Sequence, residues 1–89
     1  MNEFKVTQST HHMPCLQIED APEALHKLIR NVVLCQYTDD PRYHLRQRCG
    51  AFLQGGSDKT SGWILVEFWN PEGAQEFVDY INNEWKKME

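Results

Sequence analysis

The sequence lacks any apolar run long enough to cross a bilayer, because its longest apolar stretches cover only a few residues. Its first ten residues, MNEFKVTQST, also lack the apolar core of a signal peptide, so we expect a cytoplasmic protein without a membrane segment. It has no low-complexity tract, and 40% of its residues are hydrophobic against 25% charged, which is typical of a globular chain. The length of 89 residues therefore predicts one domain over residues 1–89.

Cysteines are few and are poorly spaced for a structural framework. There are three, an odd number, without a CxxC pair, which favours reduced thiols over disulfides. A tetrahedral zinc site is an alternative function. Its possible ligands are His11, His12, Cys15, Cys35, His44 and Cys49. Because the usual paired ligand spacings are missing, we expect neither a metal nor a cofactor.

Signals of catalysis are also scarce. Gly55-Gly56 is followed by Ser57-Asp58-Lys59-Thr60, which is typical of a hairpin loop and differs from a phosphate-binding loop. Pairs such as Cys49 with His44 lack a visible activating environment, so we expect a non-catalytic protein. The net charge of −4 disfavours generic binding to nucleic acids.

The chain does contain short alternating segments and two capped amphipathic helices. Asp20 as N-cap with Pro22 predicts the start of the first helix, and Asn70 with Pro71 predicts the start of the second. We interpret residues 38–41 as a turn. The predicted strands cover 4–10, 14–19, the second half of 42–54 and 62–69, and the predicted helices cover about 22–35 and 71–87. This β-β-α-β-β-α order predicts an α+β, ferredoxin-like two-layer sandwich, with two helices on one face of a mainly antiparallel four-stranded sheet.

One strand–helix unit carries a family resemblance. The segment SGWILVEF, residues 61–68, leads directly into the helix start at Asn70-Pro71-Glu72. This unit resembles the third strand and second helix of RNA-recognition-motif domains, whose octapeptide runs basic, Gly, aromatic, Gly/Ala, aromatic, Val, any, aromatic. The matching residues are Gly62, Trp63, Val66 and Phe68. Ser61 and Leu65 replace the basic residue and the second aromatic, and Leu16 replaces the first-strand aromatic. The resemblance implies a ferredoxin-like fold, with single-stranded RNA or DNA binding as an alternative function.

The strand within this unit is apolar on both faces. If Ile64, Val66 and Phe68 pack against the helices, alternation places the other side chains on the opposite face. Those side chains are Trp63, Leu65, Glu67 and Trp69. An exposed apolar patch marks an interface. The alternative is that the N-terminal segment or residues 37–43 cover this patch.

A basic cluster precedes this unit. Read with a period of two, the segment 42–48 places Arg42, His44, Arg46 and Arg48 on one strand face, as a ribbon suited to carboxylate or phosphate. The alternative is internal pairing with acidic residues, such as those on the last helix. We predict a small binding or regulatory module that uses the apolar open sheet face, beside this ribbon, to contact a protein partner or a second copy as a dimer.

Overall fold

The computed structural model describes residues 3–56 and 62–88. In chain order the elements are β1 (Thr7–Gln8), β2 (Pro14–Ala21), α1 (Glu23–Val33), α2 (Pro41–Cys49), β3 (Ala51–Gly56), β4 (Gly62–Phe68) and α3 (Pro71–Lys87). The predicted α+β class and four-stranded antiparallel sheet are confirmed. The described part of the chain holds three helices, however, where the sequence predicted two.

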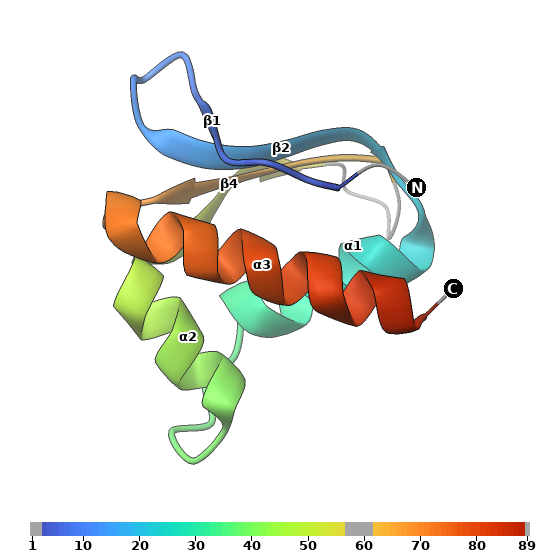
Figure 1. Ribbon diagram of the computed structural model, residues 1–89, viewed down its shortest axis with the longest axis vertical. Coiled ribbons are helices and arrows are strands. Elements are labelled where there is room, and N and C mark those ends of the chain that lie inside the picture. The colour runs from blue at the N-terminus through green and yellow to red at the C-terminus, as the bar shows by residue number, and fades with distance from the viewer. Residues whose placement is uncertain (1–2, 57–61, 89) are drawn as a thin grey trace.

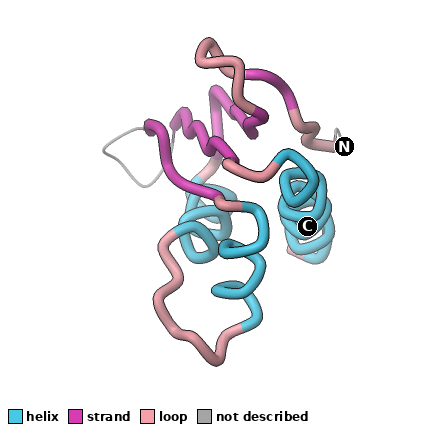
Figure 2. Tube along the Cα trace, turned by 90° about the vertical axis from the view of Figure 1, so that its left-hand side faces the viewer, coloured by secondary structure: helices cyan, strands magenta, loops and turns pink. Residues whose placement is uncertain are grey.

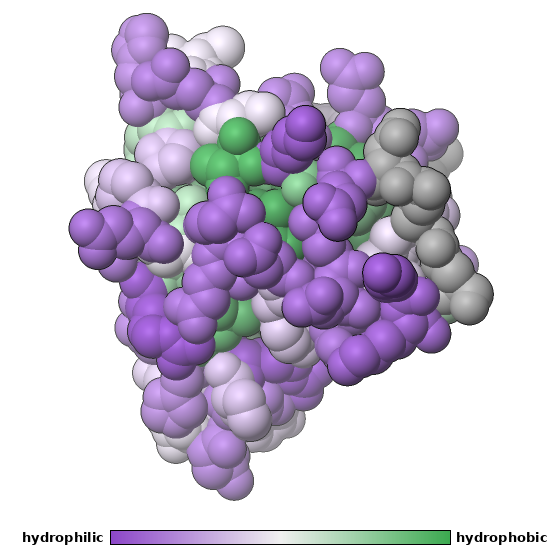
Figure 3. Space-filling model, viewed as in Figure 1, coloured by the Kyte–Doolittle hydropathy of each residue, from purple (hydrophilic) through white to green (hydrophobic). Residues whose placement is uncertain are grey.

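The sheet has the order β1-β2-β4-β3, and every neighbouring pair is antiparallel. Figures 1 and 2 show all three helices on one side of the sheet. α1 and α3 contact the strands, whereas α2 packs mainly against the other two helices. On the side viewed in Figure 3, hydrophilic residues dominate, and apolar residues are visible mainly between the sheet and α3. The molecule is therefore a sheet with one covered face and one open face.

Side chains of β4 alternate between these two faces as predicted. Ile64, Val66 and Phe68 are fully buried and belong to the core beneath the helices. From α3, the ring of Phe77 meets the ring of Phe68 edge-on, with 5.1 Å between centroids. Burying each such side chain stabilises the fold by about 1.5–3 kcal/mol. This packing fixes which side chains of β4 point away from the helices.

The two predicted helix starts have different outcomes. Asn70 is the N-cap of α3, because its side chain accepts a hydrogen bond from the Glu72 amide at 3.1 Å. The N-cap prediction for Asp20 is wrong, since this residue lies within β2 and α1 begins after Pro22 without a side-chain cap. The strand continues further than expected because Ala21 pairs with Gly62 on β4.

The extended reading of residues 42–48 is wrong, because α2 covers them. The Asp40 side chain accepts a hydrogen bond from the Arg42 amide at 2.8 Å, and Pro41 occupies the first turn. Gly50 ends the helix in the left-handed region, with φ of 59°. The expected turn at 38–41 is thus partly a helix start, while the strand in the second half of 42–54 is confirmed as β3. The expected hairpin loop at 55–60 is wrong for Gly55 and Gly56, which belong to β3, and its remaining residues 57–60 lie outside the described residues.

The N-terminal segment is held at the side of α3. Asn82 accepts a hydrogen bond from the Phe4 amide at 2.8 Å and donates one to the Phe4 carbonyl at 3.0 Å. Phe4 and Val6 pack against the core. These contacts explain why the predicted first strand is shortened to Thr7–Gln8, and they keep residues 4–6 away from the open face of the sheet.

Candidate functional site

The open sheet face carries two large exposed indoles. Trp63 is 47% exposed and Trp69 is 74% exposed, while Leu65 between them is half-buried. Neither of the two covers that the sequence suggested lies over them. Residues 4–6 contact the core beside α3. The loop before α2 lies in the helical layer, where its Tyr37 lines a cleft.

A glycine lies close to each of the two tryptophans. A Cβ atom added at Gly55 would stand 2.8 Å from Cη2 of Trp63, so this indole lies across β3. A Cβ atom added at Gly50 would stand 2.8 Å from Cβ of Trp69. The Trp69 amide also donates a hydrogen bond to the Gly50 carbonyl at 3.1 Å. The backbone of residues 50–55 therefore helps to determine where the two tryptophan side chains lie.

Phe52 extends the patch, and the sequence analysis missed it. It lies opposite Glu67 in the β3–β4 register and so shares the open face. Its ring stacks on the Trp69 indole, with 5.4 Å between centroids and 28° between planes. Phe52 is recognised as part of this patch only from the pairing register of β3 with β4, which the sequence did not define. We call the set Trp63, Leu65, Trp69 and Phe52 the aromatic face.

The single charged residue of β3 and β4 is withdrawn from solvent. Glu67 is 1% exposed, and its Oε2 lies 3.3 Å from Nδ1 of His11 in the β1–β2 turn. The Ser9 hydroxyl accepts hydrogen bonds from the His11 and Met13 amides at 3.2 and 3.3 Å, which orders this turn. The turn thus covers the carboxylate and leaves the aromatic face itself without an exposed charge.

The predicted basic residues lie in the helical layer, on α2, and are engaged there. The Arg42 guanidinium binds the Asp40 carboxylate, with Nη2 2.7 Å from Oδ2, and holds the pKa of Asp40 at about 2. Arg48 binds Glu76 on α3 through two hydrogen bonds of 3.1 and 2.7 Å, and it lowers the pKa of that carboxyl. The predicted alternative of pairing with the acidic last helix therefore applies to Arg48.

The remaining two members of the set contact Tyr43. The Arg46 guanidinium lies 5.2 Å from the centroid of the Tyr43 ring and donates a hydrogen bond to the Val33 carbonyl at 3.3 Å. His44 is exposed and meets the same ring edge-on at 5.7 Å. A strand ribbon beside the tryptophans is thus replaced by helical side chains pointing in several directions.

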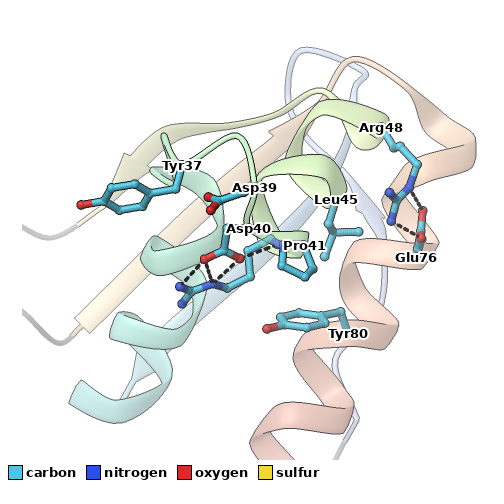
Figure 4. Close-up of a pocket in the computed structure, with 9 residues that line it drawn as sticks. Tyr37, Asp39, Asp40, Pro41, Leu45, Arg48, Glu76 and Tyr80 are labelled. Carbon is cyan, nitrogen blue, oxygen red and sulfur yellow. Dashed lines mark hydrogen bonds and ion pairs between the residues drawn. The ribbon is translucent and has the colours of Figure 1, made fainter.

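A cleft of about 820 Å³ lies between α2 and α3. Figure 4 shows Asp40, the partner of Arg42, at one end, the Arg48–Glu76 pair at the other, and Tyr80 between them. Burial raises the pKa of the Tyr80 phenol. The carboxylates of both pairs are already occupied by arginines, so the cleft is best described as part of the α2–α3 packing.

The candidate zinc ligands do not converge. Within residues 3–56 and 62–88, no group of three or more His, Cys, Asp or Glu side chains could hold a metal ion. The Cys49 thiol donates a hydrogen bond to the Leu45 carbonyl at 2.6 Å, and burial raises its pKa to about 11. The Cys15 sulfur is also buried and lies 3.3 Å from Oγ1 of Thr7. Two of the three thiols are therefore accounted for by local packing.

Comparisons with known proteins assign no family, since no family model, curated protein or solved structure matches the chain. Among the described residues, no helix is both long enough and apolar enough to span a membrane. The case for a functional site accordingly rests on the geometry of the aromatic face.

Proposed function

We propose that this protein is a small binding or regulatory module that contacts a protein partner through the aromatic face. The observation that supports this most is the state of Trp69, which is 74% exposed and yet stacked on Phe52 and fixed beside Gly50. An indole held in place before binding loses little conformational entropy when a partner covers it. Tryptophans of this kind dominate the binding energy of protein interfaces.

The arginines have a smaller part in this proposal than the sequence suggested. Asn70 donates a hydrogen bond from Nδ2 to the Arg48 carbonyl at 2.9 Å, so the end of α2 adjoins the residue that follows Trp69. We assign Arg48 to the rim of the interface, where a charge affects encounter more than affinity. We assign the other three residues of the predicted basic cluster, Arg42, His44 and Arg46, to positions outside the interface.

Single-stranded nucleic acid is the less favoured ligand for this face. Aromatic stacking alone would suit bases, but such sites also need a basic groove that follows the phosphates. β3 and β4 contribute no basic residue, and β2 contributes the exposed acids Glu19 and Asp20. A protein surface is the better match in charge.

For the fold, we propose a ferredoxin-like sandwich with α2 as an addition. The units β2–α1 and β4–α3 both place a helix on the same side of an antiparallel sheet. The two strands lie next to each other, which is the core of that arrangement.

Affinity capture with matched variants tests the proposed function. The test variant is Trp63→Ser with Trp69→Ser, and the control is Leu34→Ser with Tyr37→Ser, which removes two exposed apolar side chains from the α1–α2 loop. Each tagged protein is first checked for a native circular dichroism spectrum and then used on native extract. We expect proteins captured by the wild type and the control to be lost with the test variant. Equal capture by all three would contradict the proposal.

A further inference from the structure

The strand β2 places two carboxylates beside the exposed indole of Trp63. The register between β2 and β4 shifts after Ile18, so that both Glu19 and Asp20 stand opposite Trp63. Ile18 and Ala21 on either side contact the core, whereas Glu19 and Asp20 are exposed. Side chains opposite each other on one sheet face have Cβ atoms about 4.5–5.5 Å apart. One group of a bound molecule can therefore contact the indole and a carboxylate together.

These two carboxylates are not used within the described part of the chain. Across residues 3–56 and 62–88, neither Glu19 nor Asp20 makes an ion pair or a side-chain hydrogen bond. The helical layer differs, because Asp40 and Glu76 each bind an arginine there. The acids next to the aromatic face are thus available to a cation from another molecule.

The area of the exposed indoles indicates the size of the partner segment. At about 250 Å² for a whole tryptophan, the exposed parts of Trp63 and Trp69 provide roughly 300 Å². Two globular proteins in a stable complex bury about 800 Å² on each side. A short peptide segment needs less, because its recognition relies on a few anchoring side chains. The aromatic face therefore suits a short segment of a partner.

Resting on the proposed function, we infer that the aromatic face binds a short arginine-bearing segment of its protein partner, with one guanidinium on the Trp63 indole and in contact with Glu19 or Asp20. A guanidinium is planar, stacks on aromatic rings and presents a fork of donors that matches a carboxylate. The net charge of −4 attracts such a segment during encounter. Apolar side chains of the same segment cover Trp69 and Phe52.

Selection from a random-peptide phage library on the immobilised full chain tests this inference. We expect the selected peptides to be enriched in arginine next to apolar residues. Glu19→Gln with Asp20→Asn should lower the affinity for the best arginine peptide at least about 10-fold. The control is Asp39→Asn with Glu72→Gln, which makes the same charge change at exposed positions of the helical layer and should bind as the wild type does. Peptides selected without arginine, or no selected peptide, would overturn the inference.

Two further changes test the stacked guanidinium itself. Trp63→Leu keeps an apolar side chain but removes the aromatic ring, and it should weaken the arginine peptide several-fold. Lysine in place of the peptide arginine keeps the charge but removes the planar fork, and it should also weaken binding several-fold. Unchanged affinity in both measurements would overturn the stacked arrangement.

Capture from native extract separates this inference from the proposed function. Glu19→Gln with Asp20→Asn should lose most of the proteins that the wild type captures, as Trp63→Ser with Trp69→Ser does. If the carboxylate variant captures them fully and the tryptophan variant loses them, the proposed function stands and the arginine-bearing segment is rejected. Full capture by both variants would reject both proposals.

Discussion

The indole of Trp63 lies over Gly55, so close that a single added methyl group at the glycine would stand 2.8 Å from Cη2 of the ring. This contact joins β4 to β3 on the face opposite the helices. The half-exposed indole can lie there because Gly55 on the neighbouring strand has no side chain. The aromatic face therefore depends on what β3 lacks as well as on what β4 carries.

Gly55→Ala should move the Trp63 indole without unfolding the protein. The overpacking cost of about 1–3 kcal/mol falls on a ring that can shift toward solvent, which reduces it. We expect a red-shifted Trp63 emission, read with Trp69→Phe and Trp85→Phe to isolate the signal. Gly56→Ala is the control, because its Cβ would meet the flexible end of Arg30 at 3.2 Å and the Trp63 carbonyl oxygen at an ordinary contact distance of 3.5 Å, without touching the indole. An unchanged emission in Gly55→Ala would show that the indole does not rest on β3.

Asn70→Ala should destabilise the protein by about 1 kcal/mol, because it removes the N-cap of α3. Asn70→Asp is the matched variant, since it retains the capping oxygen but loses the donor to the Arg48 carbonyl. Urea unfolding should rank the wild type first, the Asp variant second and the Ala variant last. Equal losses in the two variants would mean that the contact with α2, and not the cap, carries the effect.

The same capping chemistry explains both a success and a failure of the sequence analysis. Asn70-Pro71 was recognised because a clean apolar stripe follows it on α3. Asp40-Pro41 has the same form, but only Leu45 and Cys49 are buried on α2. Its basic side chains, three arginines and His44, recur at every second position. That spacing matches the two-residue period of a strand, and it led to the wrong prediction of an extended segment.

The sequence could predict which β4 side chains are buried, because alternation alone places Ile64 and Trp63 on opposite faces of the strand. The membership of Phe52 could not, since it depends on the register between β3 and β4 and on a shift in that register between Leu53 and Gly55. The withdrawal of Glu67 also depends on a tertiary contact, made by His11 from 56 residues away in the chain. Such contacts leave no periodic signal in the sequence.

Stability should fall as the solution becomes mildly acidic, in part through His26. This side chain is buried on α1, and burial together with the neighbouring Arg30 lowers its pKa from the ordinary value of 6.5. Below pH 6.5 the unfolded chain therefore takes up a proton that the folded chain does not, which favours unfolding. The contribution is lost as the pH falls from 6.5 toward the lowered value.

His26→Gln should remove this part of the pH dependence, as urea unfolding between neutral pH and about pH 5 would show. The Gln side chain can still accept the hydrogen bond that Arg30 donates to Nδ1 of His26 at 3.0 Å. His44→Gln is the control, because His44 is exposed and its loss should leave the slope as it is. A slope that survives in His26→Gln would assign the effect to other groups.

Hydroxyl-radical footprinting of the protein alone and of the complex captured from native extract tests the central claim most directly, because it reports which side chains become covered. We predict that oxidation of Trp63 and Trp69 is lower in the complex, while Tyr37, which is 73% exposed in the helical layer, stays equally reactive. Protection of Tyr37 with unchanged oxidation of both tryptophans would contradict the assignment of the aromatic face as the contact surface.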